Sequence, residues 1–120
     1  MNYFFDSYAI IEIFKNNPAY DKYKEFIILT TSLNLAEVFY SLLNELDKQS
    51  ADYLINNANF EFIEITPELA LESSYFRYKN KKLNLSYADC LGYIVAKTMD
   101  IPFLTGDRGF QNMENVEYIK

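Results

Sequence analysis

Residues 2–7, Asn-Tyr-Phe-Phe-Asp-Ser, place a run of aromatic side chains directly before a carboxylate. The run over residues 3–5 is bulky and apolar and does not alternate with polar residues. This pattern is typical of a strand that is buried on both faces of a parallel sheet. Residues 8–14 have the composition of a helix. Asp6 is therefore expected where a central strand ends and a helix begins, and in open α/β sheets ligands bind at that edge.

The rest of the chain alternates between further predicted strands and helices. Runs rich in β-branched or aromatic residues predict strands over residues 26–30, 60–65, 101–105 and 116–119. Apolar periodicity and cap residues predict helices over 19–24, 31–46, 48–57, 67–79 and 86–99. This alternation implies crossover connections between parallel strands. We therefore expect an α/β fold, a three-layer α/β/α sandwich with a mainly parallel central sheet.

The composition limits the chemistry that the chain can perform. Its 120 residues, half of them hydrophobic, predict one domain over residues 1–120. The sequence contains no histidine and a single cysteine, Cys90, which we expect in the core. This excludes His-based nucleophilic catalysis, His-based acid–base cleavage and His-ligated zinc. Oxygen ligands remain, and these suit Mg²⁺, Mn²⁺ or Ca²⁺.

The charge and the apolar runs bear on partners and location. A net charge of −6 argues against a protein that simply coats nucleic acid, but it is compatible with cations held between the protein and phosphate. We find no signal-peptide pattern and no apolar run near the roughly 20 residues of a membrane span. With one cysteine, the sequence favours a reducing compartment, and we expect a cytoplasmic protein without membrane contact.

Four acids are predicted at the carboxyl edge of the sheet. Asp6 ends the first strand, Glu37 lies near the start of the helix over 31–46, Asp89 lies near the start of the helix over 86–99, and Asp107 follows the strand that ends at residue 105. Each has a simpler explanation as a helix cap or turn residue, and Asn34-x-x-Glu37 and Ser86-x-x-Asp89 both resemble capping boxes.

Capping does not require four acids to share one edge, so a second explanation is needed. Two carboxylates about 4 Å apart repel by roughly 4 kcal/mol at an effective dielectric of 20. Clustered acids are therefore protonated or bridged by cations. A histidine-free cluster of ionised acids predicts a Mg²⁺ or Mn²⁺ site.

The ordered set of motifs resembles the PIN domain family. The set comprises Asp6-Ser7 after the first strand, Glu37 at a helix start, Ser-Tyr-Ala-Asp over 86–89, and Leu-Thr-Gly-Asp-Arg-Gly-Phe over 104–110. The resemblance spans essentially the whole chain. It departs from the family at Gly109, where many members carry a further acid.

This resemblance implies a function and assigns residues to it. It implies an endoribonuclease that hydrolyses RNA phosphodiester bonds with one or two Mg²⁺ or Mn²⁺ ions, in which the acids are both catalytic residues and metal ligands. Stand-alone members of this size are often the toxin of a type II toxin–antitoxin pair of the VapC type, which implies an antitoxin partner. The aromatic helices lead us to expect a homodimer. The implied metal ligands are Asp6, Glu37, Asp89 and Asp107, with Ser7 and Thr105 as polar supports.

Several alternatives stay open at this point. The basic stretch over 77–82 is either a solvated helix end or a phosphate contact through Lys81 and Lys82. Arg108 is either a turn residue or a phosphate contact. A non-catalytic PIN-like module that binds RNA or protein, and a housekeeping RNA-processing nuclease, are the alternative functions. A phosphorelay receiver and a haloacid-dehalogenase-type phosphatase fit less well, because Asp6 stands alone where both require paired acids.

Overall fold

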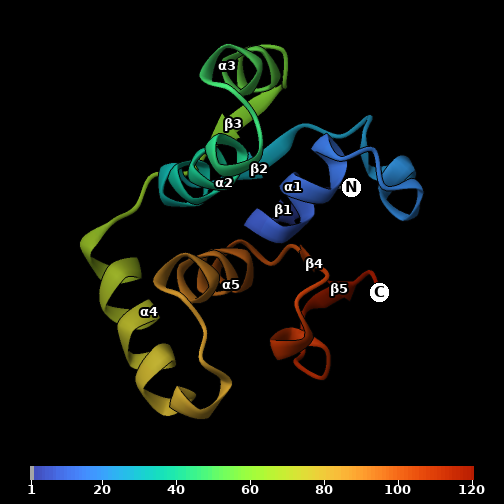
Figure 1. The fold of residues 1–120 in the computed structure, drawn as a ribbon. Helices are drawn as coiled ribbons and strands as arrows, with labels where there is room; N and C mark the ends of the chain where they lie inside the picture. Colours follow the sequence, from blue (N-terminus) through green and yellow to red (C-terminus); the bar gives the residue numbers. More distant parts are fainter. Residues whose placement is uncertain (1) are drawn as a thin grey trace.

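The computed structural model describes residues 2–120 and contains one five-stranded sheet (Figure 1). The strand order is β3-β2-β1-β4-β5, and all four neighbouring pairs are parallel. The aromatic strand that opens the chain is therefore at the centre of the sheet, as predicted. The strands are β1 (Phe4–Phe5), β2 (Ile28–Thr30), β3 (Phe60–Phe62), β4 (Phe103–Thr105) and β5 (Val116–Tyr118).

The predicted helices are all present in the described part of the chain. The α-helices are α1 (Ser7–Phe14), α2 (Ser32–Glu45), α3 (Lys48–Asn56), α4 (Pro67–Lys79) and α5 (Tyr87–Met99). The 3₁₀ helices are η1 (Pro18–Tyr23), η2 (Lys81–Leu83) and η3 (Arg108–Phe110). The helix predicted over 19–24 is thus a 3₁₀ helix that begins at Pro18. Within residues 2–120, no helix has the length and apolarity that crossing a bilayer requires.

Alternating side chains on β1 and β4 separate the core into two clusters. Phe4 and Phe103 pack with α5 and with the apolar face of α4. Phe5 and Leu104 point to the opposite face and pack with α1, η1, α2 and α3. Figure 1 shows α4 and α5 together on one side of the sheet and α2 and α3 on the other. This is the expected three-layer α/β/α arrangement.

Strands β2 and β3 are shorter than predicted. β2 begins at Ile28 rather than at residue 26, and β3 ends at Phe62 rather than at residue 65. In the strand order β3 lies at an edge of the sheet, so its pairing depends on β2 alone. Alternation of apolar residues continues past Phe62, but a strand ends where its ladder partner ends, and β2 ends at Thr30.

Close packing of α5 against the sheet depends on Gly92. A Cβ atom at this position would lie 2.7 Å from Cε1 of Phe4 and 3.1 Å from Cε1 of Phe103. Glycine is the residue that allows a helix backbone to approach two stacked aromatic rings this closely. The approach fixes the height of α5 over β1 and β4, and thereby the position of the acid near its first turn.

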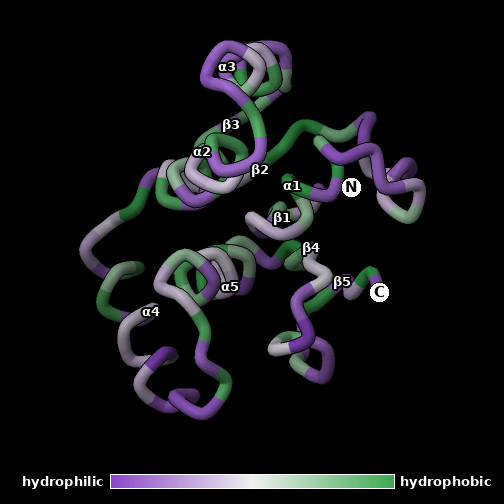
Figure 2. The backbone as a smooth tube through the Cα atoms, in the orientation of Figure 1, coloured by the Kyte–Doolittle hydropathy of each residue, from purple (hydrophilic) through white to green (hydrophobic). Residues whose placement is uncertain are grey.

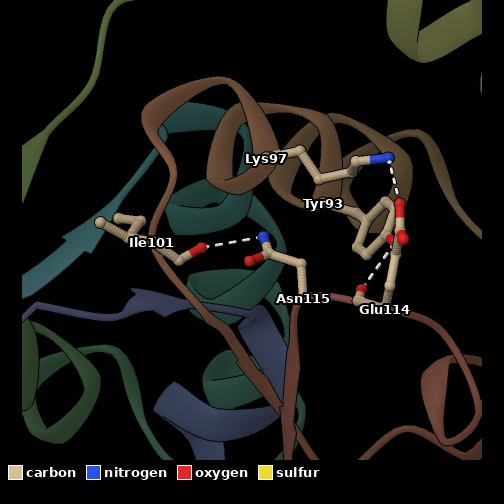
Figure 3. A network of polar contacts seen from close by, with 5 residues as sticks. All are labelled: Tyr93, Lys97, Ile101, Glu114 and Asn115. Carbon is tan, nitrogen blue, oxygen red and sulfur yellow. Dashed lines mark hydrogen bonds and ion pairs between the residues drawn. The ribbon is translucent and has the colours of Figure 1, made fainter.

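A polar network joins the far end of α5 to the chain between β4 and β5 (Figure 3). The Tyr93 hydroxyl donates to the backbone oxygen of Glu114 over 2.8 Å, and Nζ of Lys97 lies 2.9 Å from Oε1 of the same residue. Asn115 Nδ2 donates to the Ile101 carbonyl over 2.9 Å. These contacts anchor the end of the loop that leads into β5, and so they hold β5 beside β4.

Candidate functional site

Two of the predicted acids are connected through one threonine at the ends of β1 and β4. The hydroxyl of Thr105 donates a hydrogen bond of 2.6 Å to Oδ2 of Asp6, and it accepts one of 3.0 Å from the backbone N–H of Asp107. The second carboxylate oxygen of Asp6 accepts from the backbone N–H of Ser7 over 2.9 Å. Because β1 and β4 are neighbours in the sheet, their carboxyl ends bring Asp6 and Asp107 to the same place.

The other two acids are connected through one serine at the start of α5. The hydroxyl of Ser86 donates to Oε2 of Glu37 over 2.9 Å and accepts from the backbone N–H of Asp89 over 3.1 Å. The backbone N–H of Ser86 donates to Oδ2 of Asp89 over 2.9 Å. Ser86 therefore orients both carboxylates, although Glu37 belongs to α2 and Asp89 to α5.

The charges of the four acids act on one another across this edge. Burial, followed by the charge of Asp89 and to a lesser extent that of Asp107, raises the pKa of Asp6, which is fully buried. Burial, followed by the charges of Glu37 and Asp107, raises the pKa of Asp89. Within residues 2–120, no ion pair with Lys or Arg offsets these charges.

The acids stand as two hydrogen-bonded pairs rather than as a closed set of ligands. In the part of the chain that the structure describes, no three Asp, Glu or Cys side chains lie close enough together to hold a metal ion. The structure thus brings all four predicted acids to one edge, but among the described residues it does not gather three of them tightly enough to hold one metal ion.

Three of the four acids at this edge also cap a helix. Asp6 caps α1, Asp107 caps η3, and Asp89 completes a capping box with Ser86. The expected capping box between Asn34 and Glu37 is wrong. The cap of α2 is Thr31, whose hydroxyl accepts from the Asn34 backbone N–H over 3.2 Å, which places Glu37 in the second turn. Glu37 therefore has no capping role.

Asn34 instead supports the site from inside the protein. Its side chain is fully buried, and Nδ2 donates to the hydroxyl of Ser7 over 3.0 Å. Its Oδ1 accepts from the hydroxyl of Thr31 over 2.7 Å. The contact ties the start of α1 to the start of α2, and it fixes Ser7, the predicted polar support beside Asp6.

The predicted basic residues lie outside the acidic pairs. Arg108 is exposed at the start of η3, directly after Asp107. Lys81 and Lys82 are exposed on η2, and Nζ of Lys81 lies 4.5 Å from the ring centroid of Tyr78. Cys90 is buried in the core as predicted, where burial raises the pKa of its thiol to about 11.

Sequence reasoning missed two residues of this site, Ser86 and Asn34. The sequence pattern indicates only a capping role for Ser86, because its contact with Glu37 spans 49 positions and no local pattern indicates it. The pattern Asn34-x-x-Glu37 predicts that Asn34 is itself the helix cap. Its lack of exposure is the sign of an internal polar contact, but burial is not visible in the sequence.

Comparison with known proteins identifies the family. The family model described as "PIN domain" matches residues 3–116. A toxin–antitoxin complex from Klebsiella pneumoniae contains a similar chain, with a TM-score of 0.74, 17% identity, and coverage of 99% of this chain and 98% of that chain. VapBC2 from Rickettsia felis, bound to a DNA fragment from its promoter, contains another, with a TM-score of 0.73, 18% identity, and coverage of 98% and 97%.

At these identities the structural similarity concerns the fold. No curated protein matches the sequence. The family match covers nearly all of the chain, and it agrees with the sheet order and with the acids found at the carboxyl edge. This chain therefore belongs to the PIN domain family.

Proposed function

We propose that this PIN domain protein is a Mg²⁺- or Mn²⁺-dependent endoribonuclease and the toxin of a type II toxin–antitoxin pair of the VapC type. The observation that carries the proposal is the gathering of four acidic residues at one sheet edge, in two pairs that are each linked through the hydroxyl of one residue. Thr105 joins Asp6 to Asp107, and Ser86 joins Glu37 to Asp89. A PIN fold with acids at this edge is the arrangement of a nuclease.

The chemistry of the donors fits a hard divalent cation. Every candidate ligand is a carboxylate oxygen, the class of ligand that Mg²⁺ and Mn²⁺ prefer. Burial and repulsion from neighbouring acids raise the pKa values of Asp6 and Asp89. Within residues 2–120, no ion pair with Lys or Arg offsets this repulsion. A bound divalent cation offsets the free-energy cost of burying and clustering these charges, because its attraction lets the buried carboxylates stay ionised.

The residues divide into ligands and supports. We assign metal binding and catalysis to Asp6, Glu37, Asp89 and Asp107. Thr105 and Ser7 hold Asp6, and Ser86 holds Glu37 and Asp89. Divalent cations supply the activation of water and the neutralisation of phosphate charge that phosphodiester hydrolysis needs. The acids place this charge at the edge where RNA arrives, and none of them needs to act as a nucleophile.

An apolar groove supports the proposal of an antitoxin partner. The groove has a volume of about 570 Å³, lies between the start of α2, α4 and α5, and is lined by Leu33, Leu71 and Leu91 among others. Leu71 is 73% exposed at its rim. Exposed apolar surfaces of this kind mark protein interfaces. Two structures with the same fold are toxin–antitoxin assemblies, and on that basis we assign the groove to an antitoxin segment.

We also propose a homodimer located in the cytoplasm. Tyr40 and Tyr53 lie on outer helices and are 71% and 66% exposed, which provides aromatic surface for a second copy. The lone, buried Cys90 supports a reducing compartment.

Thermal melting in EDTA and in millimolar Mg²⁺ or Mn²⁺ tests the metal site. Ligand binding stabilises a folded protein by about 2.7 kcal/mol at a hundredfold excess over Kd. We expect the metal to raise the Tm of the wild type but not that of Asp89→Asn. Cleavage of single-stranded RNA should require the metal and should be lost in the same variant.

The alternatives predict different results. A non-catalytic PIN-like module shows neither metal-dependent melting nor cleavage. A housekeeping nuclease shows both, but its expression does not arrest growth. Full cleavage by Asp89→Asn contradicts the proposed site.

A further inference from the structure

Basic residues are concentrated beside the acidic pairs, at the end of α4 and in η2. Residues 77–82 contain Arg77, Lys79, Lys81 and Lys82, in a chain with a net charge of −6. Residues 73–88 contain no acid, and within residues 2–120 none of the four cations forms an ion pair. In Figure 2 the turn after α4 is largely hydrophilic. This segment is a positive patch on an acidic protein.

A pocket of about 330 Å³ lies in this patch. Arg77, Tyr78, Lys81 and Tyr87 line it, together with polar side chains that include Asn84. The volume lies within the roughly 300–1,000 Å³ of small-ligand sites. Cations and exposed aromatic rings thus share one hollow, which is the composition of single-strand nucleic-acid sites.

The guanidinium of Arg77 is fixed in this pocket. Its Nε donates to the Leu85 carbonyl over 2.9 Å, and its Cζ lies 4.2 Å from the ring centroid of Tyr87. In residues 2–120 no hydrogen bond engages its two terminal nitrogens. A stacked guanidinium with its terminal N–H groups free is pre-organised for bidentate binding of phosphate.

The pocket adjoins the proposed cleavage site. Leu85 and Tyr87, which line the pocket, are the neighbours of Ser86, and Ser86 binds both Glu37 and Asp89. When the cleaved phosphate of an RNA strand lies at the acids, a neighbouring nucleotide of that RNA therefore reaches this pocket. Tyr87 is 54% exposed and Tyr78 is 64% exposed, so both rings are accessible to an unstacked base. Bases in a duplex are not available for such stacking.

We propose that this pocket binds a nucleotide of single-stranded RNA next to the cleaved phosphate. Arg77 and Lys81 of the pocket and the adjacent Lys82 contact phosphate, and the tyrosine rings contact bases. The inference rests on the proposed ribonuclease function and extends it to a substrate-binding site. It also gives a role to the basic stretch over 77–82, which takes no part in the proposed metal site.

Binding of a fluorescent single-stranded RNA in EDTA, where metal-dependent cleavage is off, tests the site. We expect Arg77→Gln to weaken binding about tenfold, as loss of a charged hydrogen-bond donor does. The double variant Lys81→Gln, Lys82→Gln should lower the slope of log K against log salt by about 1.4, since each single-strand phosphate contact contributes about 0.7. A duplex of the same sequence should bind more weakly.

The matched control removes two exposed lysines elsewhere, Lys22→Gln with Lys48→Gln; Lys48 forms one ion pair, with Asp52 on the surface of α3. It should leave affinity and slope nearly unchanged. Because Arg77 also holds the backbone at Leu85, circular dichroism melts should check that its variants remain folded. The double variant of Lys81 and Lys82 provides a test that does not depend on this contact.

Three outcomes decide the proposal. Variants that bind RNA like the control overturn it. Unchanged RNA binding with loss of binding to a Glu-rich peptide overturns it as well, and assigns the pocket to an acidic protein segment. RNA binding that depends on Arg77 without any metal-dependent cleavage supports the pocket and contradicts the nuclease, so the two failures are distinguishable.

Discussion

The hydroxyl of Thr105 at the end of β4 donates a 2.6 Å hydrogen bond to the carboxylate of Asp6 at the end of β1, across 99 positions of sequence. Both side chains are fully buried. A threonine in this place supplies one neutral donor to an acid that has no cationic partner in residues 2–120. The pair therefore holds a carboxylate in position without neutralising it, which suits a group that must bind a cation.

Replacing Asp6 with Asn should stabilise the metal-free protein and abolish cleavage. Burial and the charge of Asp89 raise the pKa of Asp6, so its ionised form destabilises the fold at neutral pH. The amide of Asn keeps the shape and removes the charge. We expect the Tm in EDTA to rise by about 4 °C, which corresponds to about 1 kcal/mol in a domain of this size. A lower Tm in EDTA contradicts this account of Asp6.

Stability of the metal-free protein should fall as pH rises through the folded-state pKa of Asp6. A carboxyl whose pKa is raised on folding binds its proton more tightly in the folded state, so acidification through that pKa stabilises the fold. The effect ends at the unfolded-state pKa, about 3.9. Urea unfolding in EDTA across this pH range should show the gain in the wild type and a smaller gain in Asp6→Asn. Equal pH dependence in both proteins would exclude Asp6 as its source.

Local sequence signals located the edge of the sheet and its acids. The aromatic run of β1 predicted a buried central strand, and the order of strands and helices predicted a parallel sheet, because both signals come from burial and periodicity along the chain. Asp89 and its cap Ser86 were also predicted, since a capping box is encoded within four residues.

Contacts between distant segments could not be predicted in the same way. Thr31 and Asn34 are both good cap residues, and the choice between them is made by the hydrogen bond of Asn34 to Ser7, 27 positions away. The distance between the pair at Thr105 and the pair at Ser86 depends on how α5 packs on the sheet, which a sequence pattern does not encode.

Gly106 and Gly109 lie in one motif and should respond differently to alanine. A Cβ at Gly106 would clash with Cε1 of Tyr8 and would lie 2.8 Å from the Ile119 carbonyl oxygen, so Gly106→Ala must displace backbone beside Asp107. We expect a loss of about 1–3 kcal/mol, as for overpacked cores. A Cβ at Gly109 would meet the end of the Leu85 side chain at 2.9 Å, which can rotate away. Chemical unfolding of both variants measures the difference, and equal losses would contradict it.

Ser86→Ala and Thr66→Ala separate the two roles of Ser86. Both residues cap a helix, with bonds of 3.1 Å to Asp89 N and 3.2 Å to Leu69 N, so each variant should lose about 1 kcal/mol of stability. Ser86 alone also orients Glu37. We therefore expect Ser86→Ala to weaken metal binding or cleavage by about 10–100-fold, the usual cost of losing a hydrogen bond that orients a ligand. Thr66→Ala should leave both unchanged at a temperature where the protein is folded. Equal activity of the two variants would reduce Ser86 to a cap.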